Sequence, residues 1–182
     1  LEQLMSHIAR NFDLAALDEY TVEAGRPDCT DAEKLRIIKQ YGATRISINP
    51  QTFSDEVLRN IGRRHTAQDI IDCFAAARAA GHTNINMDLI AGLPGDTVEG
   101  FTASLRQAIA LDPENITVHT LTLKRASNLV VEHRAAAYDD VSAMLESCRE
   151  LADVGYRPYY MYRQKGTLQN LENIGWAKPG CE

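Results

Sequence analysis

Asp88 is the residue whose place in the chain most favours a chemical role. It belongs to residues 85–97, Ile-Asn-Met-Asp-Leu-Ile-Ala-Gly-Leu-Pro-Gly-Asp-Thr. The first half alternates between apolar and polar side chains, which is the period of a β-strand, and Gly92, Pro94 and Gly95 then end the strand before a helix. A carboxylate near the carboxyl end of such a strand lies where α/β sheets and barrels bind ligands. The alternative is an ordinary strand-to-helix turn with a solvated aspartate.

Three other predicted strands also carry polar side chains along one face. These positions are Glu19, Thr21 and Glu23; Ser47, Asn49 and Gln51; and His119. Strands covered by helices on both faces are apolar on both faces, and a closed eight-stranded barrel fills its interior with branched apolar side chains. Burying unpaired polar groups would cost roughly 1–3 kcal/mol each. The polar faces are therefore expected to line a wide lumen that holds a sizeable ligand, although an open sheet with one wet face remains the alternative.

The elements that would position these residues recur at regular intervals. Strands are expected to begin near residues 17, 45, 85, 116 and 157, and amphipathic or capped helices are expected at 1–12, 30–41, 54–61, 66–80, 97–111 and 141–152. Repeats of about 30 to 40 residues match the right-handed crossover unit, which predicts a parallel α/β sheet, open or barrel-like. Residues 124–138 give no clear pattern, and residues 164–182 are expected to be rich in loops.

Composition excludes several classes of protein. The chain has 182 residues, enough for one domain or part of a larger one, and 45% of them are hydrophobic. Its formal net charge of −6 argues against a general nucleic-acid binder. No apolar run approaches a membrane span, and no signal-peptide pattern is present, so a cytoplasmic location is expected. The chain begins at Leu1 without an initiator Met, and both ends are expected to be cut.

Several familiar kinds of site are missing from the sequence. The loop at residues 92–97 lacks the Lys-Ser/Thr ending of a phosphate-binding loop, and neither a dinucleotide fingerprint nor a hydrolase elbow is found. His119 is the one histidine on a polar strand face, where a hydrogen-bonded lining residue is favoured over a catalytic base. The four cysteines, Cys29, Cys73, Cys148 and Cys181, are far apart, so we expect free thiols and no metal site built from them.

Four motifs occur together and in order. They are Glu19-Tyr-Thr-Val-Glu23-Ala, Arg45-Ile-Ser-Ile-Asn-Pro-Gln51-Thr-Phe-Ser, Ile61-Gly-Arg63-Arg-His and Asn86-Met-Asp88-Leu-Ile-Ala-Gly-Leu-Pro-Gly95. Together they resemble the radical S-adenosylmethionine (SAM) family of oxygen-independent coproporphyrinogen III oxidases. Thr122-Leu-Lys-Arg-Ala-Ser127, Tyr160-Met-Tyr-Arg-Gln-Lys-Gly166 and Asn170-Leu-Glu-Asn-Ile-Gly-Trp-Ala-Lys-Pro-Gly180 resemble the coproporphyrinogen dehydrogenase branch. The resemblance covers most of residues 17–182.

The resemblance implies a partial TIM-type barrel with SAM in its lumen. In this family a 4Fe-4S cluster donates an electron to SAM, and the resulting 5′-deoxyadenosyl radical attacks propionate side chains of the porphyrinogen substrate, which are decarboxylated to vinyl groups. The positions that match family SAM contacts are Glu23, Gln51, Arg63, Asp88, His119 and Leu121. Glu23 would accept hydrogen bonds from the SAM amino group, Arg63 would pair with its carboxylate, and Asp88 would bind the ribose hydroxyls. An electron donor is implied as a partner.

The chain departs from the family in one respect. The CxxxCxxC motif that holds the cluster would lie upstream of residue 1, together with the first strands, so no metal ligand and no catalytic residue is expected in this chain. The barrel would be incomplete, and its open edge would favour self-association. We expect residues 1–162 to form the partial barrel and residues 163–182 to begin a C-terminal extension.

Two functions remain open at this stage. The first is a radical SAM oxidase or dehydrogenase acting on coproporphyrinogen, and the second is a related carrier of haem or porphyrin. Arg157, Arg163, Lys165 and Lys178 would serve either function by pairing with propionates, or would simply form a solvated face.

Overall fold

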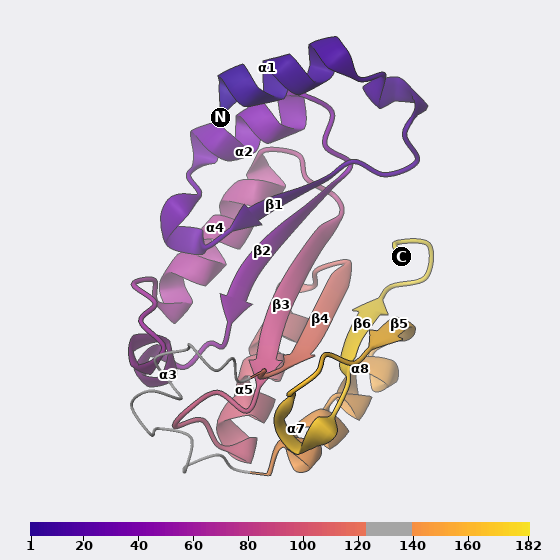
Figure 1. Ribbon diagram of the computed structural model, residues 1–182. Helices are drawn as coiled ribbons and strands as arrows, with labels where there is room; N and C mark the ends of the chain where they lie inside the picture. Colours follow the sequence, from indigo (N-terminus) through magenta and orange to yellow (C-terminus); the bar gives the residue numbers. More distant parts are fainter. Residues whose placement is uncertain (123–139) are drawn as a thin grey trace.

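The computed structural model describes residues 1–122 and 140–182. Six strands form one sheet in the order β1-β2-β3-β4-β6-β5 (Figure 1). The strands are β1 (Thr21–Gly25), β2 (Arg45–Gln51), β3 (Ile85–Ala91), β4 (Asn115–Thr120), β5 (Arg157–Tyr162) and β6 (Asn173–Ala177). Neighbours among β1 to β4 are parallel, as predicted, whereas β6 is antiparallel to both β4 and β5.

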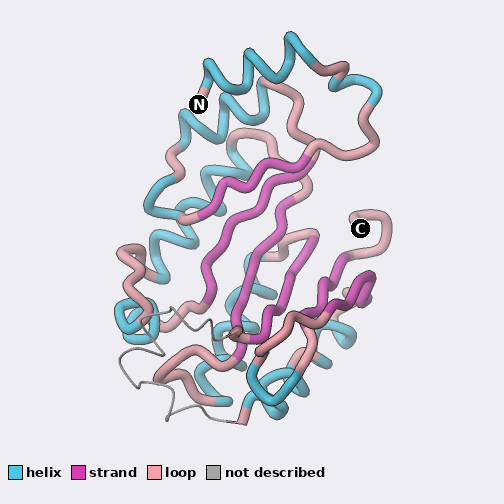
Figure 2. The backbone as a smooth tube through the Cα atoms, viewed as in Figure 1, coloured by secondary structure: helices cyan, strands magenta, loops and turns pink. Residues whose placement is uncertain are grey.

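In the described residues, helices cover one face of this sheet and leave the other face open (Figures 1 and 2). They are α1 (Glu2–Asn11), α2 (Ala32–Gln40), α3 (Asp55–Asn60), α4 (Ala67–Ala79), α5 (Val98–Leu111), α7 (Val141–Ser147) and α8 (Arg149–Asp153), with short 3-10 turns η1 (Leu14–Ala16), η2 (Pro27–Cys29) and η4 (Leu168–Asn170). No helix within 1–122 or 140–182 has both the length and the apolar character needed to cross a bilayer.

The core lies between the sheet and the helices. Alternate strand residues such as Ile46, Met87 and Ile116 are fully buried there, and they belong to one cluster with Leu35 of α2 and Phe101 of α5. The residues between them point to the other face, because side chains alternate along a strand. The sheet is thus apolar towards the helices and polar on the side that the helices leave open.

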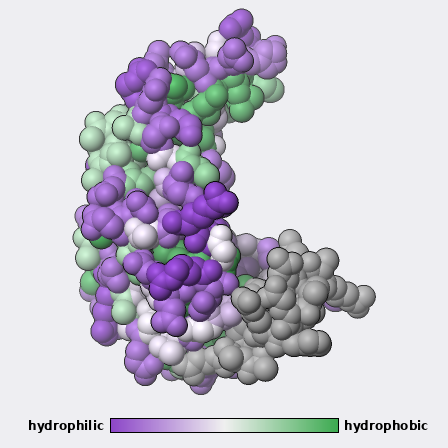
Figure 3. Space-filling view, turned by 90° about the vertical axis from the view of Figure 1, so that its left-hand side faces the viewer, coloured by the Kyte–Doolittle hydropathy of each residue, from purple (hydrophilic) through white to green (hydrophobic). Residues whose placement is uncertain are grey.

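The sheet is strongly curved. In a flat sheet, β2 and β5 would lie roughly 19 Å apart, since four strand spacings separate them. Arg45 at the start of β2 nevertheless donates a hydrogen bond of 3.0 Å to the hydroxyl of Tyr159 in β5. The space-filling view shows the resulting hollow, with the first residues of the chain overhanging it at the top (Figure 3). This is the partial barrel expected from the sequence, and β1 and β5 are the two edges of the described sheet.

Several local expectations were wrong. The first strand begins at Thr21 rather than near residue 17, because residues 14–16 form a 3-10 turn. The helix expected at 30–41 begins at Ala32 and is capped by Asp31, and the hydroxyl of Thr30 donates to the carbonyl of Ala24. The helix expected at 141–152 is divided into α7 and α8, which meet at Cys148. The expected loop-rich tail contains β6, which lies between β4 and β5.

Other expectations were confirmed. The helices expected at 54–61, 66–80 and 97–111 are present as α3, α4 and α5, with Ser54, Thr66 and Thr97 as their N-caps. The aromatic strand at 157–162 is β5. Residues 124–138, for which the sequence gives no clear pattern, lie outside the described residues.

Candidate functional site

The open face of the sheet carries a continuous chain of polar contacts. From β1 to β4, Asn49 donates to Glu23 (3.4 Å), Ser47 donates to Asn49 (3.0 Å), and Asn86 donates to Ser47 (2.8 Å). Thr117 then donates to the amide oxygen of Asn86 (2.9 Å). Because the side-chain amides and hydroxyls satisfy one another, these groups can lie partly buried on the inner wall without the cost of unpaired polar atoms.

Asp88 and His119 lie at the centre of this face. Asn86 donates to the Oδ1 atom of Asp88 at 2.7 Å, and the Nε2 atom of His119 is 3.7 Å from the same oxygen, too far for a hydrogen bond. Within the described residues the Oδ2 atom of Asp88 has no hydrogen-bond donor. Both side chains are partly exposed, at 15% and 29%. A half-buried carboxylate with one free oxygen can accept hydrogen bonds from the hydroxyl groups of a ligand.

Gln51 stands at the carboxyl end of β2 in an unusual conformation. Its φ angle is 71°, in the left-handed region that non-glycine residues rarely adopt, and the pairing of β2 with β3 shifts between Ile48 and Gln51. The side chain is buried, and its amide makes only a long contact of 3.5 Å to the carbonyl of Asn49. Backbone strain of this kind persists only where the surrounding structure imposes it, and it is common at ligand sites.

Arg63 lies beside the carboxyl end of β1. It is half-buried, and its pKa is lowered first by that burial and then by the neighbouring charge of Arg26. Arg26 is already paired with Asp28, whose pKa its guanidinium holds down to about 2. Arg63 has no ion-pair partner among the residues that the structure describes. A half-buried guanidinium without a carboxylate is suited to binding an anionic group of a ligand.

Leu121 contributes through its backbone. Its N–H donates to the carbonyl of Ala91 (3.0 Å), and its carbonyl accepts from the N–H of Leu168 (2.9 Å). The first bond extends the link between β3 and β4 beyond Thr120, and the second joins this strand end to η4.

The six positions singled out in the sequence are thus not all in contact. Glu23, Asp88 and His119 share the open face and its polar contacts, and Gln51 reaches this face only at the end of β2. Arg63 interacts instead with the Arg26–Asp28 pair. The tyrosines of β5, which also border the open face, were not included in the predicted site: Tyr159, Tyr160 and Tyr162. Nothing in the local sequence pattern shows that β5 folds back towards β2.

The cysteines do not form a metal site in the described parts of the chain, where no group of three or more His, Cys, Asp or Glu side chains could hold a metal ion. Cys73 and Cys148 are buried, and burial raises the pKa of their thiols to about 11 and about 12. Cluster ligands are thiolates, so these two side chains do not suit an iron–sulfur cluster. The polar groups of the open face, in contrast, suit SAM, because the carboxylates of Glu23 and Asp88 can accept hydrogen bonds from amino and hydroxyl groups. The guanidinium that would suit its carboxylate is that of Arg63, beside the Arg26–Asp28 pair.

Comparison with known families identifies the fold. The model of the radical SAM superfamily matches residues 5–108, which is more than half of the chain. The chain belongs to the radical SAM superfamily. The crystal structure of the radical SAM coproporphyrinogen III oxidase HemN from Escherichia coli superposes with a TM-score of 0.71, covering 98% of this chain and 39% of that one at 24% identity. That match supports the partial-barrel fold.

Among sequence relatives, the chain is similar to proteins named HemZ and HemW. The oxygen-independent coproporphyrinogen-III oxidase-like protein HemZ of Bacillus subtilis is 45% identical over the whole chain, which covers 37% of HemZ. The heme chaperone HemW of the same organism is 41% identical over 68% of the chain, which covers 33% of that protein. HemW of Escherichia coli is 30% identical over the whole chain, which covers 45% of it. The chain therefore spans about a third to under half of these relatives.

Proposed function

We propose that this chain forms the SAM-binding wall of a radical SAM enzyme that oxidatively decarboxylates coproporphyrinogen III to protoporphyrinogen IX. The polar face that runs from Glu23 to His119 carries the proposal, because it offers a long polar ligand several donors and acceptors in one hollow. The 45% identity to a coproporphyrinogen-III oxidase-like protein supports the choice of substrate.

Each residue would have a separate task in holding the cofactor. Asp88 would accept hydrogen bonds from the ribose hydroxyls through its free oxygen, and Glu23 would accept from the amino group. Arg63 would pair with the carboxylate of SAM, and Gln51 would add an amide at the end of β2. When SAM is bound at a 4Fe-4S cluster it supplies the radical that abstracts hydrogen. The residues of this chain only bind, orient and shield the reactants from water.

The cluster itself would be held outside the present residues. The thiols of this chain do not fit it, and an electron donor would deliver the reducing equivalent there. A cytoplasmic location and self-association through the edge of β1 belong to the same proposal.

A second candidate function is a haem or porphyrin carrier. The matches to proteins named heme chaperone, at 41% and 30% identity, favour it specifically. A carrier would use the same hollow but would release its tetrapyrrole unchanged.

The two functions differ in what happens to the substrate. The intact protein, including any chain beyond residues 1–182, is incubated without oxygen with coproporphyrinogen III, SAM and a reductant, and the products are analysed. We expect decarboxylated porphyrinogens for the enzyme. Tight haem binding with no decarboxylated product would support the carrier and contradict the enzyme.

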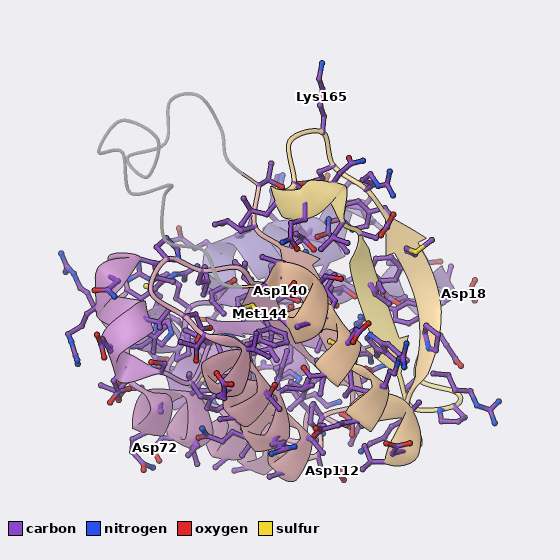
Figure 4. All side chains as sticks on the ribbon, turned by 90° about the horizontal axis from the view of Figure 1, so that it is seen from below. Asp18, Asp72, Asp112, Asp140, Met144 and Lys165 are labelled. Carbon is purple, nitrogen blue, oxygen red and sulfur yellow. The ribbon has the colours of Figure 1, made fainter. Side chains whose placement is uncertain are left out.

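The role of Asp88 is tested by the affinity of the intact protein for SAM. We expect Asp88→Ala to weaken SAM binding by about 1–3 kcal/mol, the typical effect of losing hydrogen bonds to a charged acceptor. Asp72→Ala, an exposed carboxylate of α4 on the opposite side of the sheet (Figure 4), is the matched control and should leave binding unchanged. Equal affinities of the Asp88→Ala protein and the parent, measured by calorimetry, would remove Asp88 from the SAM site.

A further inference from the structure

Strand β5 presents tyrosines to the same hollow as Asp88. The register pairs Asp88 with Thr117, Thr117 with Gly175, and Gly175 with Tyr160. Directly paired residues point to the same face of a sheet, so Tyr160 lies in one row with Asp88 on the open face. Tyr162, two residues further along the strand, points to the same face and pairs with Asn173. It lies nearer the carboxyl ends of the parallel strands.

Gly175 allows the ring of Tyr160 to lie flat on the sheet. A Cβ atom at position 175 would be 2.1 Å from the Cε1 atom of Tyr160, closer than any side chain tolerates. The ring therefore covers the place where a side chain of β6 would stand. Burial raises the pKa of Tyr160, and the charge of Asp88 raises it further, whereas a hydrogen bond with Thr117 lowers it. The phenol thus lies within electrostatic reach of the carboxylate at the centre of the site.

The rings of Tyr160 and Tyr162 form a rigid aromatic surface, called here the tyrosine shelf. Their planes are nearly parallel, at 17°, with centroids 6.0 Å apart. Tyr159 supports the shelf from the side, since its ring meets that of Tyr160 edge-on at 4.7 Å and its hydroxyl accepts from Arg45. Even so, Tyr160 and Tyr162 remain 36% and 39% exposed. Two aromatic rings that face a hollow, with no described side chain covering them, are a surface for a flat apolar ligand.

Charge around the shelf matches a ligand with carboxylates. Arg163 and Lys178 are already paired, with Glu172 and Asp112. Arg157 at the start of β5 and Lys165 just past its end are exposed, and they have no ion-pair partner in the described parts of the chain. Lys165 projects from the tip of the turn after β5 (Figure 4). An apolar surface with a free cation near each end of its strand suits a broad ring system that bears acidic side chains.

We propose that the tyrosine shelf is the surface on which the tetrapyrrole ring of the substrate lies, with one edge of the ring towards Asp88 and His119. The inference rests on the proposed function. It adds the residues that hold the ring, and it assigns to the shelf the tetrapyrrole rather than the adenine of SAM, because two rings 6.0 Å apart span more than one nucleobase. The contact requires that Gly175 lack a side chain, since any Cβ there would displace Tyr160.

The test uses protoporphyrin IX as the probe, titrated into the intact protein and followed by its absorbance and by quenching of protein fluorescence. We expect Tyr160→Ala, Tyr162→Ala and Gly175→Ala each to weaken binding by roughly tenfold or more, the effect of losing one well-packed aromatic contact. Tyr160→Phe keeps the ring and should bind within about threefold of the parent. Met161→Ala is the control on the same strand, because Met161 points to the opposite face and is 66% exposed.

Every outcome of this titration either supports or contradicts the tyrosine shelf. Binding that is lost in the three variants and kept in Tyr160→Phe and Met161→Ala supports it, provided SAM affinity and the thermal midpoint are unchanged. Tyr162 is exposed at the edge of the sheet, so Tyr162→Ala still tests the tyrosine shelf if Gly175→Ala does not fold. Loss of SAM binding alone would place the nucleoside on the shelf and overturn the proposal.

Two results separate this inference from the proposed function. Loss of protoporphyrin binding in Met161→Ala, with binding kept in Tyr162→Ala, would place the ring in an outer groove of about 490 Å³ and would overturn the shelf only. That groove is lined by Pro158, Tyr159, Tyr160, Met161, Ile174 and Trp176. A parent protein that binds and converts no tetrapyrrole would overturn the proposed function as well.

Discussion

Asp96, in the turn between β3 and α5, is expected to make the stability of the fold depend on pH. Its side chain is 4% exposed, and Oδ1 accepts from the backbone N–H of Thr97 at 3.0 Å. Oδ2 is buried and has no hydrogen-bond partner in the described parts of the chain. Burial therefore raises the pKa of this carboxyl to about 6, against the lowering effect of the bond from Thr97.

A raised pKa stabilises the fold only while the group stays protonated. That stability is complete below the carboxyl pKa of the unfolded chain and is lost as the pH rises through about 6. The expected loss in the free energy of unfolding is roughly 2–3 kcal/mol, at about 1.4 kcal/mol for each unit by which folding raises the pKa. We expect Asp96→Asn to abolish this loss. The measurement is the free energy of unfolding in urea at several pH values between 4.5 and 7.5.

Asp28 provides the control for this pH dependence. Arg26 holds its pKa near 2, so its contribution is lost only as the pH falls below the usual carboxyl range. Asp28→Asn should therefore leave the slope between pH 4.5 and 7.5 unchanged. The same slope in Asp96→Asn and in the parent would mean that Asp96 is ionised and satisfied in the folded state.

Glu114 joins three elements just before β4. Its carboxylate accepts two hydrogen bonds of 2.9 Å from Arg78 in α4, and it also accepts from the backbone N–H of Ile85, where β3 begins. Arg78 packs over the ring of Phe74 and donates to two backbone carbonyls. The side chains of Arg78 and Glu114 are 31% and 14% exposed. The pair is therefore a partly buried clamp between α4 and the start of the strands.

Removing this clamp should cost far more than removing a surface pair. We expect Glu114→Ala to lower the free energy of unfolding by roughly 2–3 kcal/mol, because it leaves the guanidinium and the N–H of Ile85 without their acceptor. Glu150→Ala is the comparison, since Glu150 forms a similar two-bond pair with Arg106, whose side chain is 66% exposed. Its expected cost is below about 1 kcal/mol. Equal costs in chemical denaturation would show that the clamp contributes no more than an exposed ion pair.

The elements that were predicted from sequence are those with a strong local pattern. The alternation of Asn86, Met87 and Asp88 determines which side chains face the hollow, because a strand repeats every two residues. β6 was not predicted, since the stretch Asn173 to Ala177 is short, contains a glycine and follows a turn. Its place between β4 and β5 depends on pairing with residues more than 50 positions away. The contact between Arg45 and Tyr159, which closes the hollow, is equally non-local.

The same distinction holds for the candidate site. Asp88 and Glu23 could be placed on one face from strand parity alone. Arg63 was expected to reach the same hollow from its loop, which stays a prediction, because no periodicity describes the turn after α3 or the nearby Arg26–Asp28 pair. Gln51 was assigned the polar parity, but the positive φ angle and the shifted register end the simple alternation at that point.

At the scale of the whole molecule, the described sheet forms one wall of a hollow. Helices cover one side of the sheet, and the other side is lined with polar groups and tyrosines; no helix of the described residues lies over that side (Figure 3). Strand β1 has no further strand on its outer side within the described residues. Unpaired strand edges promote association, so self-association remains a prediction. The chain covers at most 45% of the relatives described above, which agrees with a wall that has to be completed by other parts of the protein.

The distribution of thiols leads to a prediction for residues 1–182 taken alone. An iron–sulfur cluster needs several thiolates within a few ångströms of one another. Cys73 and Cys148 are buried and hold their protons, Cys29 lies in η2, and Cys181 is next to the last residue. We expect this chain, after anaerobic reconstitution with iron and sulfide, to show no charge-transfer absorbance in the visible range, and we expect its remaining contacts to bind SAM only weakly. A protein already known to take up a 4Fe-4S cluster, treated in parallel, controls for the reconstitution itself. A stable cluster whose spectrum changes when SAM is added to residues 1–182 would contradict the assignment of the cluster ligands to residues outside this chain.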